Sequence, residues 1–222
     1  MIEKFDEESP KKLSYTPMTT NFTKNQNNQD DIFPNNQKYR EAVGALLYLA
    51  TVSRPDKANS VGILSRKVEK PSTSDWNGII KIIRYLRATI HYKLHLKSNG
   101  APVIKAYSDA DWAGDTSDRK STSGYMFQIG NSTVSWTSKK QNCVALSLTE
   151  DKYIALALTL QELQWITQLM ENLGFAQQEA NIIFEDNISC INLSRKEKGS
   201  SYNKHIDLKY HYVYDLQKSR NC

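Results

Sequence analysis

The chain has 222 residues, of which 39% are hydrophobic, enough for one large domain or two small ones. No apolar run approaches the roughly 20 residues of a membrane helix, which excludes a membrane-spanning protein as our expectation. Three cysteines form neither an even set nor a metal-type spacing, so a disulfide framework and a zinc site are not expected. The N-terminal stretch MIEKFDEESPKK lacks the features of a signal or transit peptide. We therefore predict an intracellular protein, in the cytoplasm or nucleus and not secreted.

The positive charge is concentrated in the middle of the chain. Residues 36–100 carry 12 basic and 4 acidic side chains, a net charge of +8 against +5 for the whole chain. A local excess of this kind favours a polyanionic partner, and a basic solvated surface without a partner explains it equally well.

Composition and periodicity divide the chain into three parts. Residues 1–37 contain three prolines and a polar run, and are predicted to be a linker with no packed structure beyond a short strand. Residues 38–100 show three short amphipathic helical patterns, which need one another to bury their apolar stripes. Pro55 starts the second pattern, and Ser72 to Asp75 has the form of a capping box that opens the third.

The third helical pattern carries a row of basic residues. Lys81, Arg84 and Arg87 are spaced three apart, so they fan out over one region of the helix beside its apolar stripe. Such a row suits the phosphates of a nucleic acid, and an ordinary solvated face is the equal alternative.

From residue 101 the pattern changes to that of a mixed α/β domain. A strand is predicted over 103–109, followed by an antiparallel meander over 121–129 and 133–137 with a turn at Gly130 and Asn131. A long helix over 147–173 is closed by Gly174, and its predicted apolar face consists of Ala155, Leu158, Ile166, Leu169 and Leu173. A strand over 181–184, a short helix over 188–193 and a final helix over 206–218 complete the domain.

Two acidic motifs follow predicted strands. Asp109 and Asp111 lie in YSDADWAG after the first strand, and Asp186 lies in FEDN after the fourth. Taken alone, an Asp-x-Asp after a strand is more often a hydrogen-bonded turn than a metal site. The order of strands and the placement of these acids decide between the two.

This order resembles the C-terminal part of a copia-type retrotransposon Pol polyprotein. The stretch YREAVGALLYLATVSRPD and the helices after it resemble the thumb of its reverse transcriptase. Four further stretches, AYSDADWAGDTSDRKSTSGYMF, SWTSKKQNCVALSLTE, FEDN and KHIDLKYHYV, resemble its ribonuclease H domain. The resemblance covers over four-fifths of the chain. It implies an α/β fold: an incomplete ribonuclease H-like mixed sheet with flanking helices over 101–222, preceded by a small three-helix thumb-like subdomain over 38–100, with 1–37 as a residual palm–thumb junction.

The resemblance also implies a chemistry. Ribonucleases H cleave the RNA strand of an RNA–DNA hybrid with two Mg²⁺ ions held by four carboxylates, because this small, hard cation requires oxygen ligands. Asp109 matches the first carboxylate and Asp186 the third, so both are the implied catalytic and metal-binding residues. The second should be the last acid of Thr-Glu-Ala-Glu-Tyr, but this chain has Lys152 there. Neither Glu150 nor Asp151 simply replaces it, because one helical position is a rotation of about 100°.

We therefore expect an inactive, degenerate copy with doubtful Mg²⁺ binding. Lys152 is expected to place a cation within reach of Asp109 and Asp186. The fourth carboxylate would follow a fifth strand beyond Cys222, so the domain is expected to lack its last strand and helix and to self-associate through an exposed edge strand. The alternative to a remnant without a role is a weak, non-catalytic module that binds RNA–DNA hybrid or other nucleic acid. Contacts to phosphate or sugar would come from the three basic helix residues and from Ser108, Arg119, Lys120 and Asn187.

Overall fold

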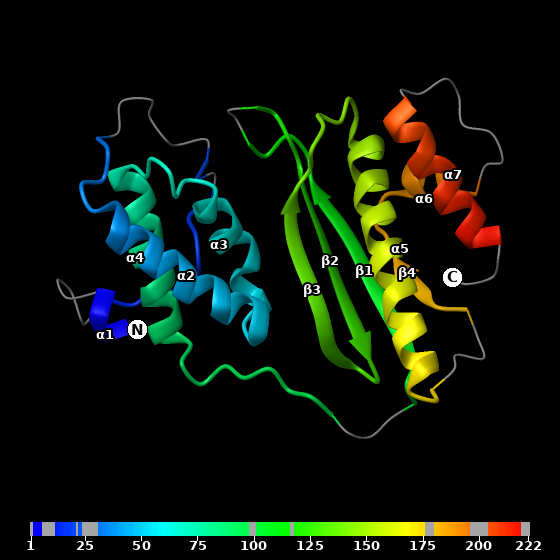
Figure 1. Ribbon diagram of the computed structural model, residues 1–222, viewed down its shortest axis with the longest axis horizontal. Coiled ribbons are helices and arrows are strands. Elements are labelled where there is room, and N and C mark those ends of the chain that lie inside the picture. Colours follow the sequence, from blue (N-terminus) through cyan, green and yellow to red (C-terminus); the bar gives the residue numbers. More distant parts are fainter. Residues whose placement is uncertain are drawn as a thin grey trace. The chain divides into compact units, whose positions relative to one another are not determined.

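The computed structural model describes residues 2–5, 12–20, 22–23, 31–97, 101–115, 118–175, 180–195 and 204–218. The chain divides into two compact units, residues 1–94 and 95–222 (Figure 1). Within the described ranges, no helix is both long enough and apolar enough to cross a membrane.

The first unit is helical. It contains α1 (Ile2–Phe5), α2 (Asn36–Val52), a 3-10 turn (Pro55–Lys57), α3 (Ala58–Ser65) and α4 (Thr73–Ala88). The predicted capping box is confirmed: the Ser72 hydroxyl accepts from the Asp75 amide, and the Asp75 carboxylate accepts from the Ser72 amide. This box satisfies two amides that the first turn of α4 would otherwise leave unpaired. The apolar faces of α2, α3 and α4 form one core around the fully buried Tyr39.

The described parts of residues 1–37 pack against these helices more than the sequence predicts. Phe5 is buried, and Met18, Phe22 and Phe33 pack against the same core. Ile32 forms an isolated antiparallel bridge with Ser72. The prediction of a linker without packed structure is therefore wrong for these segments. Isolated aromatic residues separated by polar runs carry no periodic signal, although each can fill a gap between helices.

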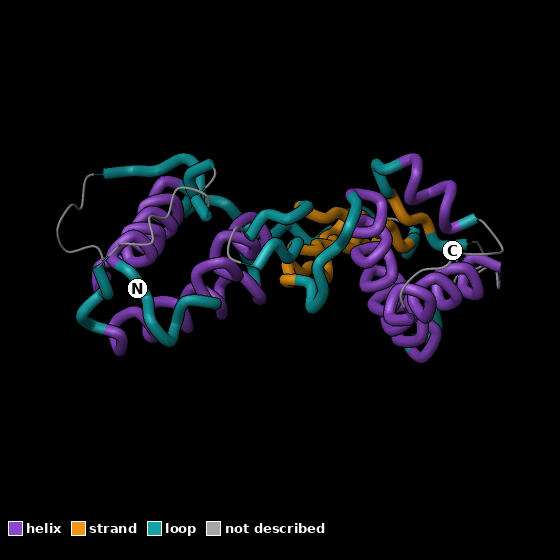
Figure 2. Tube along the Cα trace, turned by 90° about the horizontal axis from the view of Figure 1, so that it is seen from above, coloured by secondary structure: helices purple, strands orange, loops and turns teal. Residues whose placement is uncertain are grey.

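The second unit is built on a four-stranded mixed sheet. Its strands are β1 (Ile104–Asp111), β2 (Thr122–Ile129), β3 (Ser132–Lys140) and β4 (Ile182–Phe184), in the order β3-β2-β1-β4. β2 is antiparallel to β1 and β3, whereas β4 is parallel to β1. The predicted turn between β2 and β3 is confirmed, because Gly130 and Asn131 both take the positive φ that a two-residue hairpin of this type requires. The strands form one layer in Figure 2.

The helices of this unit are α5 (Leu148–Asn172), α6 (Ile188–Ser194) and α7 (Lys204–Lys218), and α5 lies along β1 and β2 (Figure 1). The core joins Ile104, Ala106 and Phe127 of the sheet to the buried face of α5. The predicted face is confirmed at Ala155 and Ile166, which are buried, but it is wrong near the end of the helix, where Leu169 and Leu173 are exposed and Met170 is buried instead. The helix has apolar residues on several sides, so its periodicity alone does not identify the side that meets the sheet.

Candidate functional site

Asp109 lies in β1, and Asp186 follows the neighbouring strand β4, two residues after its end. In the parallel pairing of β1 with β4, Lys105 lies opposite Ile182 and Tyr107 opposite Phe184. Extending this register by two residues places Asp109 opposite Asp186. The preceding pair supports the alignment, since the rings of Tyr107 and Phe184 stack with centroids 4.9 Å apart.

The sequence predicts that the first strand ends at Asp109, and this prediction is wrong. β1 continues to Asp111, because β2 remains paired with it as far as Thr122. Asp109 pairs with Gly124 within this ladder, and its side chain is 77% exposed. A carboxylate within a strand has a backbone fixed on both sides, so its position is well defined.

Lys152 joins the two carboxylates. It lies in the second turn of α5, and its ammonium group donates to Asp109 Oδ1 and, at 2.9 Å, to Asp186 Oδ1. Its side chain is only 8% exposed, whereas that of Asp186 is 78% exposed. The expected proximity of this cation to both acids is confirmed. We call these three residues the lysine bridge.

The lysine bridge changes the ionisation of its members. Burial alone would lower the pKa of Lys152, but its hydrogen bonds to Asp109 and Asp186 outweigh burial and raise that pKa well above the usual value. The hydrogen bond from Lys152 is the main reason that the pKa of Asp186 is lowered. The ammonium is therefore held charged across the physiological pH range.

These residues do not fit a magnesium ion. An ammonium group donates three hydrogen bonds and has no lone pair for a metal, while Mg²⁺ requires several oxygen ligands. Within the part of the chain that the structure describes, no group of three His, Cys, Asp or Glu side chains is placed to hold a metal ion. The Lys152 ammonium therefore provides the positive charge between the two acids in place of a metal cation.

The other acids at the start of α5 have structural partners. The Glu150 carboxylate accepts from the Leu146 amide at 2.9 Å, so it caps the helix. Asp151 is fully buried and accepts from Gln141 Nε2 at 2.6 Å. Burial raises the pKa of Asp151 to about 6 despite this hydrogen bond. Because these carboxylates contact Leu146 and Gln141, neither Glu150 nor Asp151 adds an oxygen ligand to the lysine bridge.

Behind Asp186, the FEDN motif has an inward-facing acid that the sequence analysis overlooked. Glu185 Oε2 is buried without a hydrogen-bond partner among the described residues, and Oε1 accepts from the Asn187 amide at 3.1 Å. Burial raises the pKa of Glu185 to about 7, and burial likewise raises that of the nearby Cys190 thiol to about 12. The alternation of strand β4, continued past Phe184, is the signal that places Glu185 and Asp186 on opposite sides.

The predicted contacts to phosphate or sugar are dispersed. Ser108 is buried, and its hydroxyl makes no hydrogen bond with the described residues. Asn187 caps α6 through a bond from the Cys190 amide at 2.8 Å. Arg119 is exposed, and Lys120 Nζ lies 4.0 Å from Asp118 Oδ2. The nucleic-acid contacts of these four residues stay predictions.

The basic row of α4 is partly covered. Lys81, Arg84 and Arg87 are all half-buried, and Lys81 and Arg84 line a cavity that also includes residues 12–14. The Ser14 amide lies against the Arg84 carbonyl at 3.5 Å. Lys81 and Arg84 therefore form part of the wall of a cavity and do not lie on a fully open helix face.

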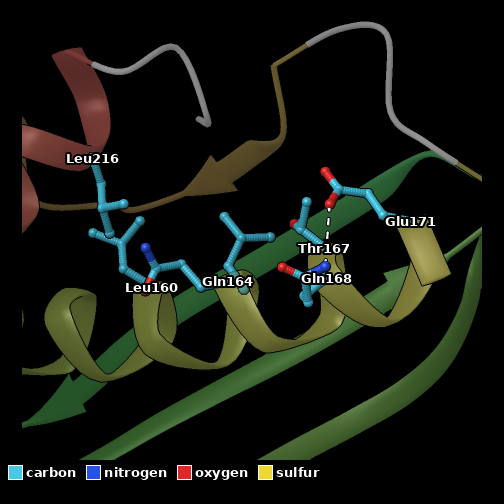
Figure 3. Close-up of a pocket in the computed structure, with 7 residues that line it drawn as sticks. Leu160, Gln164, Thr167, Gln168, Glu171 and Leu216 are labelled. Carbon is cyan, nitrogen blue, oxygen red and sulfur yellow. Dashed lines mark hydrogen bonds between the residues drawn. The ribbon is translucent and has the colours of Figure 1, made fainter.

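A separate cavity lies further along α5. It has a volume of about 430 Å³ and lies between that helix and Leu216 of α7, where Gln168 donates to Glu171 at 3.5 Å (Figure 3). Its nearest α5 residue, Leu160, lies two turns after Lys152, or about 12 Å along the axis. This cavity is therefore separate from the lysine bridge.

Together these features define an α/β protein with a helical unit and a four-stranded mixed sheet. The chain is 40% identical over 178 residues to the retrovirus-related Pol polyprotein from transposon TNT 1-94 of Nicotiana tabacum, a match that covers 80% of this chain and 13% of that protein. It is 41% identical over 180 residues to the Pol polyprotein from transposon RE2 of Arabidopsis thaliana, covering 81% of this chain and 12% of that protein. It is also 48% identical over 132 residues to secreted RxLR effector protein 161 of Plasmopara viticola, covering 60% of this chain and 93% of that protein.

Over about four-fifths of its length, the chain is a homologue of retrovirus-related Pol polyproteins from copia-type transposons. It spans about an eighth of the length of the Pol polyproteins that it matches. No protein-family model matches the chain, and no solved structure matches it.

Proposed function

We propose that the chain is the reverse-transcriptase thumb and ribonuclease H-like region of a retrotransposon Pol protein, in a form that does not cleave RNA–DNA hybrids. The strand order β3-β2-β1-β4, with β1 and β4 parallel and an acid at each, supports the ribonuclease H-like assignment. The observation that carries the loss of activity is the lysine bridge. Its ammonium lies between the two carboxylates that the family resemblance assigns to the metal ions.

The physical argument is one of charge and ligand number. Two-metal hydrolysis requires oxygen ligands that position the ions and stabilise the leaving oxygen. Lys152 already neutralises part of the negative charge of Asp109 and Asp186, so an incoming Mg²⁺ would meet a repelling cation and too few ligands. The three residues of the lysine bridge hold β1 and the segment after β4 in register, but they supply neither a nucleophile nor a metal ion.

The test is hybrid cleavage by the purified, unmodified chain. We expect no Mg²⁺-dependent cutting of the labelled RNA strand beyond that of the Asp109→Asn variant purified in parallel. This variant is the matched control, because it keeps the size of the side chain and reports any contaminating nuclease. Mg²⁺-dependent cutting that Asp109→Asn abolishes would show that the lysine bridge opens and that the protein is an enzyme.

A further inference from the structure

A large cavity in the helical unit has a strongly basic lining. It has a volume of about 720 Å³ and lies between residues 12–14, the first turn of α2 and the exposed side of α4. Four of its lining side chains are cationic and three are aromatic: Lys12, Lys38, Lys81, Arg84, Phe5, Phe33 and Trp76. The size is within the range of small-ligand sites, about 300–1,000 Å³.

No carboxylate lines this cavity among the residues that the structure describes. The acids of α2 and α4 are engaged elsewhere. The Asp75 carboxylate accepts from Ser72 in the capping box, and Glu41 pairs with Lys4 at 2.8 Å. Without counting Arg84, the three lysines Lys12, Lys38 and Lys81 give the described lining an excess of positive charge, which favours an anionic ligand.

Two aromatic side chains on one side of the cavity are stacked on each other. The rings of Phe33 and Trp76 stack with centroids 4.7 Å apart and planes within 13°, and Lys38 Nζ lies 5.5 Å from the Trp76 centroid. A flat apolar surface beside cations is the combination that nucleotide-binding proteins use, because bases stack on aromatic rings and phosphates bind ammonium and guanidinium groups.

We propose that this cavity binds a single unpaired nucleotide, with its phosphate near Lys12 and Lys81 and its base against the Phe33–Trp76 pair. The nucleotide can be free or part of a single strand, since both offer the same chemistry. A base within a duplex does not fit, because it must leave its stack to enter a concave site. This inference is independent of the proposed loss of cleavage, which concerns the other unit.

The experiment measures binding of a short labelled single-stranded oligonucleotide to the full chain by fluorescence anisotropy. Lys12→Glu combined with Lys81→Gln is expected to weaken binding about tenfold or more and to reduce the salt dependence by about one to two phosphate contacts. The matched control is Lys70→Glu, because Lys70 is exposed in the same unit and does not line the cavity. We expect the control to change the affinity less than twofold.

Competing ligands test the contact with the base separately from the contact with the phosphate. A free nucleoside triphosphate should displace the oligonucleotide better than pyrophosphate, which lacks a base, and Trp76→Leu should remove that advantage. Unchanged far-ultraviolet circular dichroism would show that the variants fold. Equal binding of duplex and single strand, equal weakening by Lys70→Glu, or no binding at millimolar protein would each overturn the proposal. Equal competition by pyrophosphate would overturn the contact with the base.

Discussion

Lys152→Glu is expected to turn the lysine bridge into a divalent-cation site. The substitution removes the ammonium between Asp109 and Asp186 and places a third carboxylate on the same helix position. Three carboxylates at one point repel one another, so the variant should be less stable than the wild type without metal. Mg²⁺ or Mn²⁺ should then restore stability, by about 2.7 kcal/mol at a concentration 100 times the dissociation constant.

The measurement is the melting temperature of both proteins as a function of metal concentration, with titration calorimetry for the affinity. The wild-type melting temperature should not depend on millimolar Mg²⁺, whereas that of Lys152→Glu should rise with it. Lys152→Gln is the matched control, since it removes the cation without adding a carboxylate and should respond weakly. A metal response as large in the wild type as in Lys152→Glu would contradict our description of the lysine bridge.

This bridge is the part of the site that the sequence predicts best. Asp109 and Asp186 each lie next to a short apolar run with a clear strand pattern, and the parallel register then determines that they meet. Lys152 follows from the helical spacing after Ser147, which caps α5 as its position suggests. Local patterns of this kind predict the structure well, because each element forms from residues that are close together in the sequence.

The inward-facing polar groups could not be predicted in the same way. Glu150 and Asp151 look like ordinary acids of a helix N-terminus, and only the approach of Leu146 and Gln141 shows what each one binds. Both partners lie on segments that precede α5, and their positions depend on how β3 ends. The bond with Leu146 is a local cap and that with Gln141 depends on the path of the chain between β3 and α5, and neither follows from a sequence period.

A buried lysine in the first unit is the clearest case of a residue whose environment the sequence conceals. Lys57 lies at the end of the 3-10 turn, where a lysine is normally solvated, yet it is fully buried and its Nζ has no hydrogen-bond partner among the described residues. The neighbouring acid is already occupied, because Arg54 forms a two-pronged ion pair with Asp56 at 2.8 and 2.9 Å. Tyr85 also donates to Asp56 at 2.8 Å.

Burial, with the nearby charge of Arg54, lowers the pKa of Lys57 to about 8 from a usual value of 10.5. Between these two values the unfolded chain keeps a proton on Lys57 that the folded chain has released. The free energy of unfolding of this unit should therefore rise as the pH increases from about 8 to 10.5. At 1.36 kcal/mol per pKa unit, the whole rise is at most about 3 kcal/mol, and the same amount is missing at neutral pH.

Lys57→Met should recover most of that amount. Methionine has a similar length and flexibility and no charge to desolvate, so we expect the variant to be more stable than the wild type by about 1–3 kcal/mol at pH 7. The difference should shrink towards zero as the pH rises through 8 to 10.5. Hydrogen exchange of the most protected amides of α4 measures the stability of this unit separately from the other.

Taking the difference between the two proteins at each pH cancels the other groups that titrate in the same range. Among these is Tyr85, whose pKa is raised by burial, so that it makes stability fall as the pH rises above its usual value. Lys70→Met is the control for removing a lysine as such, because Lys70 is exposed and should change stability by less than about 0.5 kcal/mol at every pH. If Lys57→Met is destabilising at pH 7, or if its advantage does not fall with increasing pH, the Lys57 ammonium has a partner in solution and is not a buried, unpaired charge.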